Sequence, residues 1–151
     1  MKLPDDVRSQ KKRIFMSLFG VLISGVCVGF MKVAAFGVDP FQVLVAGLDR
    51  TIPIAFGTLY VLMNGVLLLF SLMADRHNIG LATFINLFLL GYVVDFTRAV
   101  LGALFPAPGM VLREGFMVFG IVALCIGSAL YMTADLGVST YDAVAIVMSK
   151  K

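Results

Sequence analysis

The chain has 151 residues and a formal net charge of +3; 60% of its residues are hydrophobic, 14% are charged, and the mean hydropathy is +1.01. Soluble domains average about 45–50% apolar and about 25% charged residues. The composition therefore excludes an ordinary soluble domain, a disordered chain and a disulfide scaffold, and it indicates an integral membrane protein.

Residues 1–12 form a basic segment ahead of the first apolar run. Five of the 12 lysines and arginines lie within the first 13 residues. Such clusters bind nucleic acids or anionic membrane surfaces. No nucleic-acid recognition motif is present and an apolar run follows at once, so we expect a cytoplasmic membrane flank and no nucleic-acid partner. Arg76 would share this inner side, with Arg50, Arg98 and Arg113 outside, which predicts a cytoplasmic N-terminus.

Four segments reach the length of about 20 mainly apolar residues that a membrane-spanning helix needs. They lie at about 13–36, 53–74, 79–104 and 113–136. A polar turn at 75–78 and a loop with two prolines and a glycine at 105–112 separate the later segments. The sequence therefore predicts an all-α, polytopic transmembrane bundle.

A shorter helix is expected between the first two spans. Asp39 is a good N-cap, Pro40 suits the first helical position, and Gln42 stands where a capping box has Glu or Gln. This helix has about 10–12 residues and a length of about 15–18 Å, which is half of a bilayer core. We interpret it as a re-entrant or interfacial half-helix.

The chain repeats itself weakly with an offset of 100 residues. The matches are Arg13 with Arg113, Phe19-Gly20 with Phe119-Gly120, Ala34 with Ala134, Gly37-Val38 with Gly137-Val138, and Phe41 with Tyr141. A second half-helix is predicted to start at 139–142. Because the first copy, 13–104, holds three spans, the second would be inverted, as in many secondary transporters. The second copy, 113–151, is incomplete, so we expect either a truncated chain or another chain that supplies the missing helices.

Residues 34–96 resemble the YczE/YyaS/YitT family of bacterial membrane proteins, and the YczE branch most closely. The resemblance rests on GVDPFQVL at 37–44, IAFGT at 54–58, IGLAT at 79–83 and GYVVD at 91–95. Gln42 departs from the Asp usual in the family, Asp142 keeps it in the second copy, and Ala82 replaces a usual Gly. The resemblance implies a multi-pass protein of the bacterial cytoplasmic (inner) membrane, usually longer than 200 residues, for which a transport role is commonly assumed.

Six polar residues are candidates for binding a solute or lining a polar path: Asp39, Gln42, Asn86, Asp95, Arg98 and Asp142. Asp95 and Arg98 either line such a path or form a local ion pair at i,i+3. Asp39 and Asp142 either cap the half-helices or attract a proton or cation there. Asn86, like Asn64, either bonds a neighbouring helix or contacts a ligand. Lys32 either extends to the membrane surface or serves as a charge partner for Asp39 or Asp135.

No nucleophile–base pair, phosphate-binding loop or metal-ligand cluster stands out, so we expect no enzymatic activity, no cofactor and no metal. The predicted function is that of a small-molecule permease. The alternative is a non-transporting scaffold or subunit of a complex. The expected partners are the lipid bilayer, a small-molecule substrate, and a second copy or another membrane chain.

Overall fold

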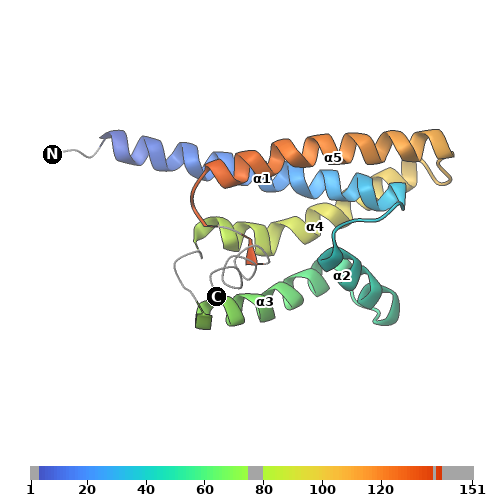
Figure 1. Cartoon of the computed structure of the whole chain (residues 1–151), viewed down its shortest axis with the longest axis horizontal. Helices are drawn as coiled ribbons and strands as arrows, with labels where there is room; N and C mark the ends of the chain where they lie inside the picture. The colour runs from blue at the N-terminus through green and yellow to red at the C-terminus, as the bar shows by residue number, and fades with distance from the viewer. Residues whose placement is uncertain (1–3, 75–79, 138, 141–151) are drawn as a thin grey trace.

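The computed structural model describes residues 4–74, 80–137 and 139–140. These residues contain five helices, α1 (Pro4–Ala34), α2 (Pro40–Thr51), α3 (Phe56–Ala74), α4 (Leu81–Leu104) and α5 (Met110–Thr133), and no strand (Figure 1). Four of the helices are long and apolar enough to cross a membrane, over Gln10–Ala34, Phe56–Met73, Leu81–Leu104 and Met110–Thr133. The prediction of an all-α membrane bundle is confirmed.

Some helix boundaries differ from the prediction. The basic N-terminal segment is helical from Pro4 onward, because proline at the first turn fits a helix start and the charged residues that follow are compatible with helix. The chain around Pro53 connects α2 to α3 instead of starting the second span. At the other end of the bundle, α5 begins at Met110, inside the predicted loop.

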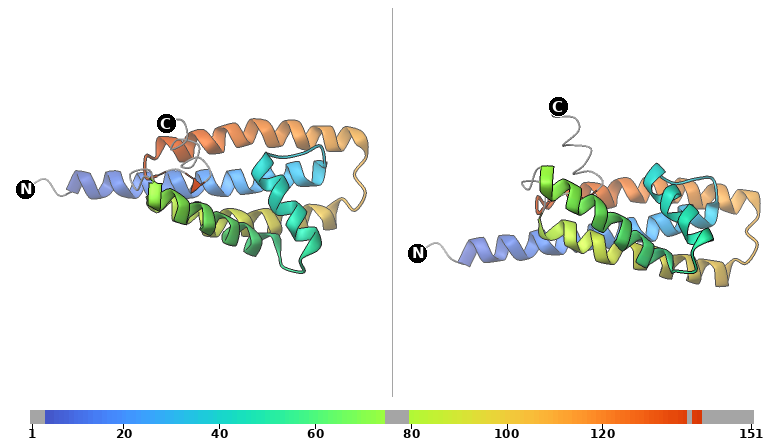
Figure 2. Two further views of the ribbon diagram at one scale, coloured as in Figure 1. Left: turned by 60° about the horizontal axis from the view of Figure 1, so that its bottom comes forward. Right: turned by 90° about the horizontal axis from the view of Figure 1, so that it is seen from below.

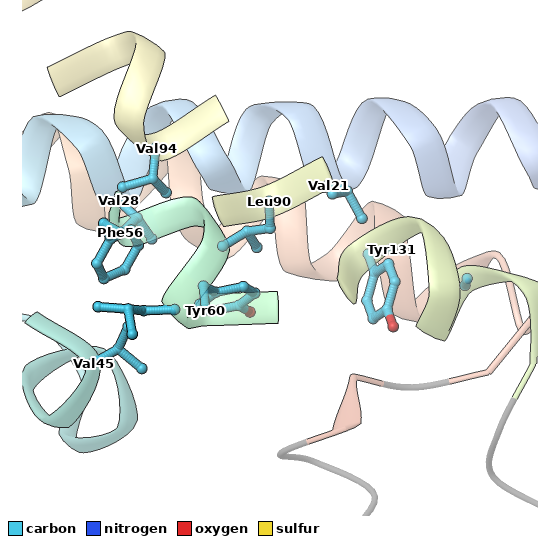
Figure 3. Packing of buried hydrophobic residues seen from close by; sticks show 10 residues of the cluster. Val21, Val28, Val45, Phe56, Tyr60, Leu90, Val94 and Tyr131 are labelled. Atoms are coloured by element: carbon cyan, nitrogen blue, oxygen red, sulfur yellow. The ribbon is translucent and has the colours of Figure 1, made fainter. Parts of the chain in front are cut away.

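The helices pack in a fixed order. The long helix α1 lies antiparallel to α5 and also contacts α4; α3 packs on α4, and the short α2 packs on α3, tilted across the long helices (Figure 2). One apolar cluster joins side chains from all five helices, including Val21, Val45, Phe56, Val94 and Tyr131 (Figure 3). The outward faces are apolar too: Met73, Phe96 and Val111 are 89%, 71% and 83% exposed. Such a surface suits contact with a lipid bilayer.

Glycines let α1 and α5 approach closely. A Cβ placed on Gly20 would lie 2.7 Å from the Tyr131 nitrogen and 2.8 Å from the Gly127 carbonyl oxygen. A Cβ on Gly120 would lie 2.6 Å from Met31 Cγ. The two glycines are separated by the 100-residue offset, and each meets the equivalent region of the other helix. Small residues of this kind allow membrane helices to pack backbone to backbone.

The two helices also end in the same way. Ala35 and Asp135 have positive φ values of 57° and 50°, and Gly37 and Gly137 have φ values of 122° and 113°. A left-handed residue just past the last turn is a common way to stop a helix. The backbone therefore makes the same kind of turn after α1 and after α5, at positions 100 residues apart.

Two arginines make reciprocal contacts across this helix pair. Arg13 of α1 forms an ion pair with Asp135, just beyond the end of α5, at 3.1 Å. Arg113 of α5 donates from Nε to the carbonyl oxygen of Ala34, the last residue of α1, at 2.7 Å. The two arginines thus reach the ends of each other's helices, although Arg13 contacts a side chain and Arg113 contacts the backbone carbonyl groups of Ala34 and Ala35.

The start of α4 depends on the chain that follows α5. The Ala82 N–H donates to the carbonyl oxygen of Leu136 at 3.1 Å, and the Gly80 N–H donates to Thr83 Oγ1 at 3.2 Å. A Cβ on Gly80 would collide with the same Leu136 carbonyl group. Glycine at this position is therefore a steric requirement of the contact.

We expect Gly20→Ala to lower the free energy of unfolding by about 1–3 kcal/mol, because the added methyl group overpacks the contact between α1 and α5. Gly115→Ala is the matched control, because a Cβ on Gly115 of α5 has no atom within 4 Å. The control should be neutral or stabilising, since alanine favours helix over glycine. Thermal unfolding in detergent measures both; equal effects of the two substitutions would contradict the assigned packing.

Candidate functional site

Asp39 caps the start of α2 as the sequence predicts, but the Gln42 half of the expected capping box is missing. Asp39 has an extended backbone, and its Oδ1 accepts a hydrogen bond from the Gln42 N–H at 3.0 Å. The reciprocal bond expected from Gln42 is not formed. Its side chain is instead buried, with 5% of its surface exposed, and its Oε1 has no hydrogen-bond partner within the described ranges. The prediction of a complete capping box is therefore wrong.

Gln42 lines a cavity of about 240 Å³ that reaches between the helices and is partly open to the outside. Among the residues that line this interior cavity are Asp39, Gln42, Tyr60, Asn86, Tyr131 and Ser139. Three of the candidate residues therefore lie at one site, together with the predicted start of the second half-helix. Asp39 is exposed, so the cavity extends from an accessible carboxylate to a buried amide.

Part of the lining of the interior cavity follows the 100-residue offset seen in the sequence. Its lining includes Ser24 and Leu124, Val28 and Ser128, and Asp39 and Ser139, three pairs separated by 100 residues. Each pair takes one residue from α1 or the turn after it and one from α5 or the turn after it. The cavity therefore lies where the two equivalent segments face each other. Of this lining, Ser139 was predicted as the start of the second half-helix, whereas the tyrosines and the other serines were not; the 100-residue offset was the signal that could have related Ser24 and Ser128 to the site.

Buried polar bonds connect α3 with its neighbours beside the interior cavity. The Tyr60 hydroxyl donates to Asn86 Oδ1 at 3.3 Å, which joins α3 to α4. The Asn64 amide donates to the Tyr60 carbonyl oxygen at 2.9 Å and accepts from the Thr140 hydroxyl. Asn64 and Asn86 thus both form hydrogen bonds to other segments. This was one of the two roles expected from the sequence; the other was contact with a ligand. Asn86 combines that contact with a place in the cavity lining.

Asp95 and Arg98 do not form the local ion pair considered from the sequence. Asp95 accepts from the Gly57 N–H at 2.6 Å, at the start of α3. Arg98 pairs with Asp49 of α2 at 3.3 Å. Each side chain thus reaches a different helix, because the packing of α2 and α3 on α4 offers partners that local spacing does not show. Neither residue lines the interior cavity.

A second cavity, of about 370 Å³, lies where α1, α2 and α4 carry charged residues. Lys32, Asp49, Arg50 and Arg98 line it. The Lys32 ammonium group lies 2.7 Å from the centre of the Phe56 ring and has no hydrogen-bond partner in the described part of the chain. It interacts electrostatically with Asp39 but forms no ion pair with it. Lys32 therefore packs inward against an aromatic ring and forms an ion pair with neither Asp39 nor Asp135, the two partners considered from the sequence.

Asp142, the last candidate residue, and most of the predicted second half-helix lie outside the described residues. Within the described ranges, no group of three or more His, Cys, Asp or Glu side chains is arranged to hold a metal ion.

The comparisons with known proteins identify relatives of unknown function. A model described as a family of unknown function (DUF6198) matches residues 11–151. An uncharacterized protein of Haemophilus influenzae is 26% identical over 139 residues, which cover 91% of this chain and 62% of the relative. The chain thus spans less than two thirds of the length of that relative. No solved structure matches it significantly.

We expect Asp95→Ala to lower the free energy of unfolding by about 1–3 kcal/mol, because it leaves the Gly57 N–H without an acceptor inside the bundle. Asp95→Asn should lower the free energy of unfolding less, since its amide oxygen can still accept the hydrogen bond from Gly57. Asp49→Ala is the control: it breaks a partly exposed ion pair, which contributes only about 0–1 kcal/mol. Unfolding in detergent measures all three, and equal losses for the two Asp95 variants would argue against the capping role.

Proposed function

The chain belongs to the DUF6198 family of unknown function, and from the geometry of the interior cavity we propose that it is a membrane transport protein for a small polar solute. The observation that carries this proposal is the set of three offset pairs around that cavity, at positions 24 and 124, 28 and 128, and 39 and 139. In transporters built from inverted repeats, the substrate binds at the interface between the repeats, next to the starts of broken helices.

The chemistry of the cavity supports a polar solute. A buried amide oxygen without a hydrogen-bond partner costs free energy, about 1–3 kcal/mol. Gln42 lines the cavity and carries such an oxygen; if its amide turns toward the cavity, a bound solute with an N–H or O–H group would supply the missing donor. The volume of about 240 Å³ lies below the 300–1,000 Å³ of typical drug-sized ligand sites, so the solute is small.

The remaining details of the proposal follow from the sequence. The basic N-terminal segment lies in the cytoplasm, and the membrane is the inner membrane of a bacterium. The resemblance to the YczE/YyaS/YitT family and the mirrored ends of α1 and α5 support an inverted repeat, of which the second copy begins with α5. The protein moves its solute without chemical change and does not act as an enzyme.

We expect Gln42→Leu to abolish solute uptake while the thermal unfolding midpoint stays equal or rises. The leucine has similar volume and removes an oxygen that has no hydrogen-bond partner among the described residues, so we expect no loss of stability. The measurement is uptake into proteoliposomes from a panel of radiolabelled amino acids, short carboxylates, short amines and polyols.

Asn64→Leu provides the contrast. Asn64 is hydrogen-bonded on both sides of its amide and does not line the cavity, so its loss should lower stability. If wild-type protein takes up no member of the panel better than empty liposomes, or if Gln42→Leu transports as well as wild type, the transport proposal fails. The alternative role as a non-transporting scaffold subunit would then be favoured.

A further inference from the structure

We propose that the interior cavity binds a small organic ammonium compound. This inference rests on the proposed function because it names the solute class of the same cavity. Binding can nevertheless be measured without transport, so the two proposals can fail separately. Charge, aromatic rings and hydrogen-bond acceptors each contribute to the argument.

The charge of the cavity wall is negative. Among the described residues that line it, Asp39 is the only one with a charged side chain. Its Oδ1 caps α2, but a carboxylate has about four lone-pair sites, so acceptor capacity remains for a ligand. The basic residues Lys32, Arg50 and Arg98 line the second cavity instead. A cationic solute would therefore meet one opposite charge, whereas an anion would meet a like charge.

Aromatic rings surround the same space. Phe41, Tyr60 and Tyr131 all line the cavity, and the Phe41 and Tyr60 rings lie edge to face with centres 5.8 Å apart. Tyr60 and Tyr131 are each 5% exposed and come from α3 and α5 (Figure 3). The faces of aromatic rings attract ammonium groups, most strongly where water is excluded. Aromatic side chains beside a carboxylate are the arrangement that such a cation needs.

The unpaired acceptor of Gln42 favours a solute that donates hydrogen bonds. Gln42 lines the cavity, and its buried Oε1 accepts no bond from the described residues; a turn of the amide would bring this oxygen to a ligand in the cavity. Gln42 lies in the same first turn that Asp39 caps. An ammonium N–H can donate to this oxygen while the positive charge faces the carboxylate. A carboxylate solute could not donate to it, because an ionised carboxylate is an acceptor only.

The test compares ethylammonium with propionate, its anionic counterpart of similar size, on the full chain purified in detergent at constant ionic strength. Binding is followed by the shift of the thermal unfolding midpoint with ligand concentration. Ethylammonium should stabilise the protein in a saturable way, and propionate should not. Saturable stabilisation by propionate alone, or by neither ligand, overturns the proposal.

Asp39→Asn is the decisive variant, because asparagine caps a helix as well as aspartate and only the charge is lost. We expect it to weaken ethylammonium binding about tenfold or more, as for the loss of one ionic partner. Asp49→Asn makes the same change in the same helix but outside the cavity, and it should bind ethylammonium like wild type. Equal ethylammonium affinity of wild type and Asp39→Asn overturns the proposal.

The outcomes also separate the two proposals. If ethylammonium binds and depends on Asp39, but proteoliposomes take up no solute, the binding site stands and the transport function fails. If uptake of another solute depends on Gln42 while ethylammonium does not bind, the transport function stands and the ammonium assignment is overturned.

Discussion

At Gly20 and Gly120, the backbones of α1 and α5 approach so closely that a side chain at either position would collide with the opposite helix. Between lipid-exposed helices there is little hydrophobic driving force, so such close packing supplies much of the attraction. The rest of the bundle is built outward from this pair, because α4 packs on α1, α3 on α4, and α2 on α3. The interior cavity lies along the same pair, so the contact that holds the helices together also sets the distance across the candidate site.

The second constraint is that polar groups inside the bundle need partners, since unsatisfied groups are costly away from water. Most of the polar side chains discussed here obey it by reaching another segment: Asp95 bonds the start of α3, Tyr60 bonds Asn86, and Asn64 bonds Thr140. Within the described residues, the buried atoms Asp95 Oδ1, Lys32 Nζ and Gln42 Oε1 depart from this pattern. Of these three residues only Gln42 lines the interior cavity, so its amide is the one that a solute bound there could satisfy.

Hydropathy and helix-start chemistry predicted much of this architecture. The four spans follow from apolar length, and the half-helix follows from Asp39 and Pro40, because both signals are local. The 100-residue offset anticipated the matching ends of α1 and α5. Local signals could not predict the partners of Asp95, Arg98 and Lys32, which come from helices distant in sequence. Of the candidate site, the sequence identified Asp39, Gln42 and Asn86. The two tyrosines that complete the cavity could not be predicted, because only the packing of α3 and α5 brings them to it.

The bond between Ala82 and the Leu136 carbonyl group links the first turn of α4 to residues made much later during synthesis. The first N–H groups of a helix have no partner within it. When α4 leaves the ribosome, its acceptor has not yet been made, so this end must remain hydrated until α5 is in place. The segment after α5 thereby ties the first turn of α4 to the end of α5, and both of these helices pack on α1.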